Sequence, residues 1–173
     1  MNDFINMQLM QEKDDYDKDI KESFAVNLKN CQASGQCPTC NNFLQHNIYI
    51  IDKDLVLFEN KKILVILEKQ PRRSGHTILI IKEHYEDISE MPKSIIDDLY
   101  DISAKIISAI KIVLKAKKVY FVTMCDGGRN HLHFQFIPRY EGENHGSTVF
   151  VSTRMNIKKD IALITQLKNL INN

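Results

Sequence analysis

The sequence predicts an α+β fold in which a mainly antiparallel sheet of five to six strands packs with one long helix and one C-terminal helix. The first indication is a series of short runs rich in Ile, Val, Leu and Phe at residues 47–51, 55–59 and 62–67, separated by polar, turn-like residues. The second is a helical repeat that begins at residue 93. Strands precede this helix, and further strands and a second helix follow it, which favours an α+β arrangement.

The expected elements follow a polar segment at residues 1–30, which we interpret as an N-terminal extension of a single domain at 31–173. The breaker at 71–75 precedes a fourth strand at 77–81. The long helix presents one apolar stripe, which consists of Ile95, Leu99, Ile102, Ile106, Ile110 and Val113. The remaining expected elements are a strand at 119–124, a strand at 131–137 and an amphipathic helix at 157–171.

Composition and charge exclude several classes of protein. Hydrophobic residues make up 43% of the 173 residues, charged residues make up 26%, and 23 basic side chains balance 22 acidic ones. Such a chain can bury a core, and its near-neutral charge argues against a nucleic acid partner. No apolar run approaches the roughly 20 residues of a membrane span, and the N-terminus becomes acidic where a signal peptide would be cleaved. We therefore expect a cytoplasmic protein without membrane contact.

The strand at 131–137 has two chemically different faces. Polar and apolar residues alternate along it in the order His131, Leu132, His133, Phe134, Gln135 and Phe136. Since successive strand side chains point to opposite faces, one face is expected to join the core and the other to form a site. A single histidine beside a core strand is more often structural. Two histidines and a glutamine in strict alternation are harder to explain by packing alone.

The turn before this strand has the sequence Gly127-Gly128-Arg129-Asn130. Its glycines could bring backbone N–H groups close to a phosphate, and its guanidinium could add a bidentate contact. A plain tight turn explains the same residues equally well.

A Cys-x-x-Cys pair, Cys37 and Cys40, provides half of a tetrahedral zinc site. The other ligands could come from Cys31, from Cys125 or from the six histidines of the chain. A redox pair is the rival interpretation, but that motif belongs between a strand and a helix of a βαβ unit, whereas this one precedes a series of strands. A pair without chemistry is the third possibility.

Two motifs together resemble the histidine triad (HIT) superfamily of nucleotide-processing enzymes. The first is Gly-His-Thr at 75–77 with His84 behind it, and the second is the His-x-His-x-Gln strand that ends in Pro138-Arg139. The resemblance covers about residues 37–140, with the motifs and the intervening helix in family order. Gln135 stands where typical HIT hydrolases have histidine. In this respect the chain is similar to the galactose-1-phosphate uridylyltransferase branch and to diadenosine tetraphosphate phosphorylases.

The resemblance implies roles for these residues. It completes a structural zinc site, with the ligands Cys37, Cys40, His84 and His131. It implies that His133 is the nucleophile, that Gln135 holds phosphoryl oxygens, and that His76 supports them from the neighbouring strand. Four protein ligands would leave the metal no open position for water.

Further positions match by register with nucleotide-binding residues of the family. Glu68 stands where an acidic residue binds the ribose hydroxyls, and Leu67 and its apolar neighbours would line the base pocket. Residues Gly128, Arg129 and Asn130 replace the usual serine-containing turn that contacts phosphate, so the phosphate contacts there could differ from those of the family.

The expected function is nucleotide hydrolysis or nucleotidyl transfer at the α-phosphorus, through a covalent nucleotidyl-histidine intermediate on a nucleotide or dinucleotide substrate. The alternative is a nucleotide-binding regulatory module with little turnover, which is favoured by Gln135 and the short turn. A zinc knuckle that binds nucleic acid is disfavoured by the near-neutral charge. The resemblance also implies a homodimer, whereas the base, the leaving group and the acceptor stay open.

Overall fold

The computed structural model describes residue 26 and residues 29–31, 33–45, 52–125, 130–155 and 158–173. The chain divides into two compact units, Met1–Ile50 and Ile51–Asn173. In the first unit the helix α2 covers Pro38–Gln45. Most of the expected extension at 1–30 and the whole of the expected strand at 47–51 lie outside the described residues.

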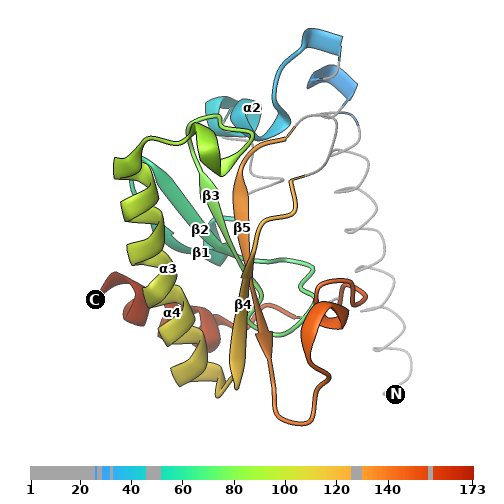
Figure 1. Ribbon diagram of the computed structural model, residues 1–173, viewed down its shortest axis with the longest axis vertical. Coiled ribbons are helices and arrows are strands. Elements are labelled where there is room, and N and C mark those ends of the chain that lie inside the picture. The colour runs from blue at the N-terminus through green and yellow to red at the C-terminus, as the bar shows by residue number, and fades with distance from the viewer. Residues whose placement is uncertain (1–25, 27–28, 32, 46–51, 126–129, 156–157) are drawn as a thin grey trace, which may run out of the picture. The chain divides into compact units, whose positions relative to one another are not determined.

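The second unit is built on a five-stranded sheet with the order β1-β2-β3-β5-β4 (Figure 1). All neighbouring strands are antiparallel. The strands are β1 (Val56–Glu59), β2 (Ile63–Leu67), β3 (Thr77–Ile81), β4 (Lys118–Val122) and β5 (His133–Arg139). The α+β class predicted from the sequence is confirmed. β5 lies between β3 and β4 in the sheet, although it is the last of these strands in the chain.

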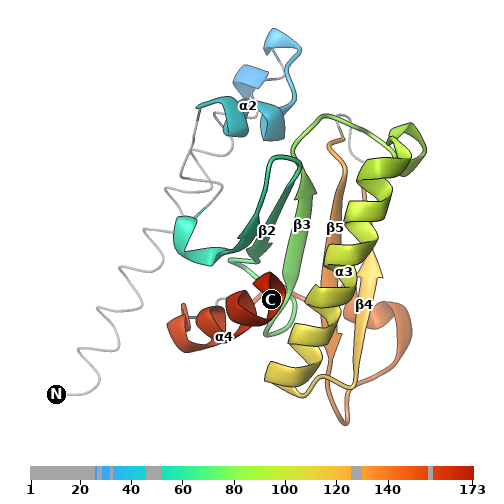
Figure 2. The ribbon, with the colours of Figure 1, turned by 90° about the vertical axis from the view of Figure 1, so that its left-hand side faces the viewer.

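Two helices, α3 (Lys93–Leu114) and α4 (Ile161–Asn172), cover one face of the sheet, as the two views in Figures 1 and 2 show. They bury apolar strand residues such as Val65, Leu79 and Phe134 in one core cluster with their own stripes. The long helix begins after Pro92, and its last turn closes at Lys115 in the left-handed conformation, with φ 55°. None of the described helices is long and apolar enough to cross a membrane.

Short single-turn helices account for several boundaries that differ from the sequence prediction. The turns η1 (Lys53–Leu55), η2 (Ile88–Glu90) and η3 (Gly146–Val149) lie between the main elements. The expected strand at 55–59 begins one residue later because the Asp52 side chain accepts a hydrogen bond from the backbone N–H of Asp54 and caps η1. The C-terminal helix begins at Ile161, not at 157, because Asp160 caps it through the N–H of Leu163.

Candidate functional site

The polar residues of β5 lie on the sheet face opposite to α3 and α4. Gln135 pairs with Ile78 of β3 and His133 pairs with Ile80, so these side chains share one face. The alternate residues Phe134 and Phe136 belong to the core cluster. The strand therefore has the two faces that its sequence predicts, and its polar face lies beside part-buried side chains of β3.

His133 is held in a defined tautomer by its own strand. Its Nδ1 lies 2.9 Å from the backbone oxygen of His131. Because a carbonyl oxygen only accepts hydrogen bonds, Nδ1 must carry the proton, which leaves the lone pair on Nε2. In this tautomer Nε2 is available as a nucleophile or a base.

The thiol of Cys125 is a neighbour of His133 that sequence reasoning considered only as a possible metal ligand. Its Sγ lies 3.5 Å from Nδ1 of His133, and it can donate to the carbonyl of His131 at 3.6 Å. Thr123 Oγ1 lies 3.3 Å from the same Sγ. In the sequence Cys125 comes shortly before the Gly-Gly-Arg-Asn turn. It lies beside the imidazole ring of His133 because β5 runs antiparallel to β4.

His76 is fully buried behind this face and is neutral at pH 7. Burial, together with the positive charges of Arg154 and Arg72, lowers its pKa to about 4, although the interaction with Gln135 opposes them. Its Nδ1 accepts a hydrogen bond from the backbone N–H of Arg72 at 3.2 Å. The proton of the neutral ring is therefore on Nε2.

This tautomer makes His76 complementary to Gln135. Among the described residues, His76 Nε2 and Gln135 Oε1 are both buried without a hydrogen-bond partner. One is a donor and the other is an acceptor, and the interaction of the two side chains affects the pKa of His76. A small side-chain movement that joins them would satisfy both atoms and leave the amide N–H groups of Gln135 for a ligand.

Two of the expected metal ligands, His84 and His131, lie together in the second unit. Their rings meet edge to face, with centroids 5.4 Å apart. His131 is buried, and Nε2 lies 2.6 Å from the backbone oxygen of Ile81, so this nitrogen carries the proton and Nδ1 carries the lone pair. Burial also lowers the pKa of His131, which favours the neutral ring that a metal needs.

The other two expected ligands, Cys37 and Cys40, lie at the start of α2 in the first unit. The backbone N–H of Asn41 donates to the oxygen of Cys37 at 3.0 Å, which continues the helical turn through the pair. Burial raises the pKa of Cys40 to about 12, with further contributions from a hydrogen bond to Cys37 and its charge.

The expected ligand set takes Cys37 and Cys40 from the first unit and His84 and His131 from the second. Two sulfur and two imidazole ligands are a typical set for tetrahedral zinc. Four protein ligands fill such a coordination shell, so the chemistry of this donor set fits a structural metal. Cys31 and Cys125 are not part of this set.

Glu68 follows β2 and lies beside His76. Its backbone N–H donates to the oxygen of His76 at 2.8 Å, and its Oε1 accepts from the N–H of Gln70 at 3.0 Å. Leu67 pairs with Thr77 and packs against the core cluster, so it lies on the helix-covered face. Because strand residues alternate, the position that faces the polar side belongs to Ile66, not to Leu67. Thus the structure does not bring Leu67 together with the polar site residues.

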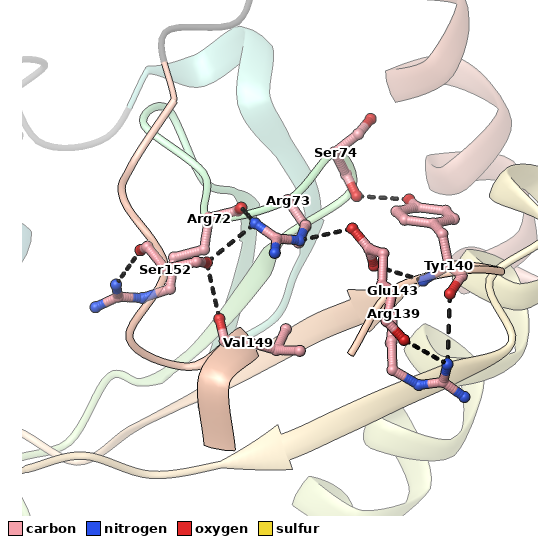
Figure 3. A network of polar contacts seen from close by, with 8 residues as sticks. All are labelled: Arg72, Arg73, Ser74, Arg139, Tyr140, Glu143, Val149 and Ser152. Carbon is pink, nitrogen blue, oxygen red and sulfur yellow. Dashed lines mark hydrogen bonds and ion pairs between the residues drawn. The ribbon is translucent and has the colours of Figure 1, made fainter. Parts of the chain in front are cut away.

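The expected phosphate-binding turn is only partly described. Gly128 and Arg129 lie outside the described residues, and Asn130 is half buried immediately before His131. The sequence shows Arg72-Arg73 as a basic pair, but it does not predict which residues Arg72, Arg73, Arg139 and Arg154 contact. Figure 3 shows Arg72 and Arg73 directed at Ser152, and Glu143 between Arg73 and the start of the segment after β5.

Comparisons with known proteins found a matching family model and similar sequences and folds. A family model described as "HIT domain" matches residues 51–142. An uncharacterised HIT-like protein of Methanocaldococcus jannaschii is 32% identical over 114 residues, which cover 62% of this chain and 84% of that protein.

Two solved structures are similar in fold. A zinc-bound histidine triad family protein of Mycobacterium smegmatis has a TM-score of 0.55 and 20% identity, over 68% of this chain and 84% of that chain. A uridylyltransferase has a TM-score of 0.55 and 15% identity, over 88% of this chain and 50% of that chain.

Proposed function

Because this chain belongs to the HIT domain family, we propose that it hydrolyses or transfers a nucleotide at its α-phosphorus through a covalent intermediate on His133. The observation that carries the proposal is the 2.9 Å contact of His133 Nδ1 with the oxygen of His131, which leaves the Nε2 lone pair for attack. Gln135 is two residues after His133 in β5, so its side chain lies on the same face of the sheet. The resemblance of the His-x-His-x-Gln strand to the HIT motif supports the same assignment.

The reaction needs two displacements. In the first, the Nε2 lone pair of His133 attacks the α-phosphorus, a P–N bond forms, and the bond to the leaving group breaks with its electron pair on that group. The ring now bears a positive charge, which the carbonyl of His131 stabilises through Nδ1–H. In the second, an oxygen of water or of a phosphorylated acceptor attacks the phosphorus, and any proton on that oxygen passes to solvent. The P–N bond breaks, and Nε2 recovers its electron pair.

Gln135 would stabilise the phosphoryl group without proton transfer. Its amide N–H groups can donate to non-bridging oxygens, and these hydrogen bonds strengthen as charge shifts in the transition state. His76, neutral at pH 7, would hold the amide oxygen and so set which end of the amide faces the phosphate. Because an amide is no acid, the leaving group must take its proton from elsewhere or need none.

Trapping the intermediate tests the proposal. The purified protein is mixed with a diadenosine polyphosphate that carries a labelled α-phosphate, quenched in base and analysed for label on the protein. A histidine adduct should be stable in base and released in acid. Absence of protein-bound label during measured turnover would contradict the covalent route.

Substitution of Gln135 should lower the rate without removing the nucleophile. We expect Gln135→Ala to reduce kcat by roughly 10²-fold, the scale of losing one preorganised donor to a developing charge. Gln135→His restores the pattern of HIT hydrolases and should increase the fraction of intermediate that water consumes. The measurement is the ratio of hydrolysed to transferred product at fixed acceptor concentration, and an unchanged ratio would show that Gln135 does not set the acceptor.

The second candidate function is a nucleotide-binding module with little turnover. It is favoured by Gln135, because this residue cannot protonate a leaving group. In that case nucleotides bind at micromolar concentrations, but neither products nor a labelled adduct accumulate with any member of a panel of diadenosine polyphosphates, nucleoside phosphoramidates and nucleotide sugars.

A structural zinc ion is part of the proposal. Cys37, Cys40, His84 and His131 would hold it as a closed set of four ligands, so it would stabilise the fold and not activate water. The backbone oxygen of Ile81 would orient His131 through its Nε2 proton.

A homodimer is also proposed, with α3 and β4 near the interface. β4 is an edge strand, and Tyr100 and Ile112 of α3 are 54% and 53% exposed. Edge strands and exposed large apolar side chains both favour association. Light scattering at micromolar concentration should give twice the mass of one chain, and the mass of a single chain would refute the dimer.

A further inference from the structure

A segment after η3 is tied closely to the loop between β2 and β3. The backbone N–H of Met155 donates to the oxygen of Pro71 at 2.8 Å. Arg72 Nη1 donates to the oxygen of Ser152 at 2.7 Å, and Arg73 Nη1 donates to its hydroxyl at 3.1 Å, as Figure 3 shows. These contacts fix the backbone on both sides of residue 154 against the end of the sheet that carries Glu68 and His76.

These contacts place the side chain of Arg154 next to Glu68. Its Nη1 donates to the backbone oxygen of Gln70 at 3.0 Å and lies 3.4 Å from Oε2 of Glu68. The Glu68 side chain is only 16% exposed, and its other oxygen accepts from the N–H of Gln70. Both carboxylate oxygens of Glu68 therefore have a partner, one local and one supplied by a distant part of the chain.

The carboxylate of Glu68 lies on the polar face of the sheet. Leu67 packs against the helix-covered core, so the next residue, Glu68, lies on the face that carries His76 and Gln135. Arg154 also acts on this face, because its charge lowers the pKa of His76. Arg154, Glu68 and the neutral ring of His76 therefore form one group of interacting side chains where β2 ends and β3 begins.

We propose that Arg154 is a positioning residue that sets the preference of the site for ribose with a free 2′-hydroxyl. This proposal rests on the proposed function and on the resemblance, which implies that Glu68 accepts hydrogen bonds from the ribose. An ionised carboxylate only accepts hydrogen bonds, so it binds a sugar with two hydroxyl donors more tightly than a sugar with one. This preference for ribose depends on the direction of the two carboxylate oxygens, and the contact with Arg154 sets the direction of Oε2.

Charge supports the same role. A nucleotide brings phosphate groups, and an unneutralised carboxylate near them would oppose binding. Arg154 offsets the charge of Glu68 without removing its acceptors, whereas a glutamine at position 68 would replace one acceptor by a donor. Arg72 is a second cation that interacts with Glu68, and its Nη1 already donates to the backbone oxygen of Ser152.

The experiment compares binding of a ribonucleotide and its 2′-deoxy counterpart to the full-length protein by calorimetry. The probe is whichever of AMP, GMP, CMP and UMP binds most tightly. The wild type should prefer the ribonucleotide, and Arg154→Gln should lower this preference by about tenfold, toward no discrimination. Lys159→Gln is the matched control, because it removes a cation from the same segment whose partners, Asp52 and Asp54, are different, and it should leave the preference unchanged.

A double-mutant cycle separates positioning from direct contact. In a Glu68→Gln background, Arg154→Gln should have no further effect on the preference, because Arg154 acts through Glu68. An equal effect in both backgrounds, or an Arg154→Gln variant with unchanged preference, would overturn the role of Arg154. A wild type that binds ribo- and deoxyribonucleotides equally would overturn it too and leave the proposed function standing. A wild type that binds none of the four nucleotides would overturn both.

Discussion

Replacement of His133 by alanine should abolish turnover while nucleotide binding stays measurable. The substitution removes the nucleophile of the first displacement, so the covalent route is lost, whereas the ribose and phosphate contacts of the pocket remain. A loss of about 10⁴-fold or more in kcat, with a change of less than about tenfold in nucleotide Kd, is the expected pattern. Steady-state kinetics and calorimetry on the same preparation measure the two quantities.

Two further variants make the His133 result specific. His145 is an exposed histidine before η3, and His145→Ala should keep wild-type kcat. Cys125→Ser replaces the thiol beside Nδ1 of His133 by a hydroxyl and should reduce kcat only modestly, because the carbonyl of His131 still holds the ring. If His133→Ala turns over substrate at the wild-type rate, the covalent mechanism is wrong, and the family membership reports the fold without this chemistry.

Removal of the proposed metal should be the largest stability effect. We expect about one zinc ion per chain in protein purified without chelators, and almost none in Cys37→Ser. Because the energy of binding a structural metal is folding energy, its loss should cost about 4 kcal/mol or more. For a chain of this length that corresponds to a fall of roughly 10 °C in Tm.

The zinc prediction is checked by elemental analysis together with thermal unfolding. Cys31→Ser is the control for metal content, because Cys31 is the cysteine of the first unit that does not belong to the proposed ligand set. It should retain about one zinc ion per chain. Wild-type protein that contains no zinc, or Cys37→Ser that keeps its full zinc content, would contradict the assignment.

Periodicity alone was sufficient for most of the fold. The three- and four-residue spacing from Ile95 to Ile110 identified α3, because a helix buries one stripe, and those residues are buried. The alternation of polar and apolar residues from His131 to Phe136 identified β5 and its two faces, because successive side chains of a strand point to opposite sides. The motifs also identified the family, which the family model confirms over residues 51–142.

Element ends were less accurate, because caps and single turns compete locally with the periodic pattern. Asp52 and Asp160 each cap a helical turn through a backbone N–H, and this moved the start of β1 and of α4 from the expected residues. Leu67 illustrates a different difficulty. It belongs to an apolar run, and such a run does not indicate which of its residues point to which face until the register with β3 is known.

The sequence by itself determined the fold class, the family and the residue types available for chemistry, because these depend on composition and on short-range spacing. Only the tertiary structure decided the tautomer of His133, the burial of His76 behind Gln135 and the contact of Arg154 with Glu68. Each of these depends on strand register and on the path of a loop. A hydrogen bond between segments that are distant in the sequence produces no repeating pattern in either segment. Its partners can therefore be identified only from the tertiary structure.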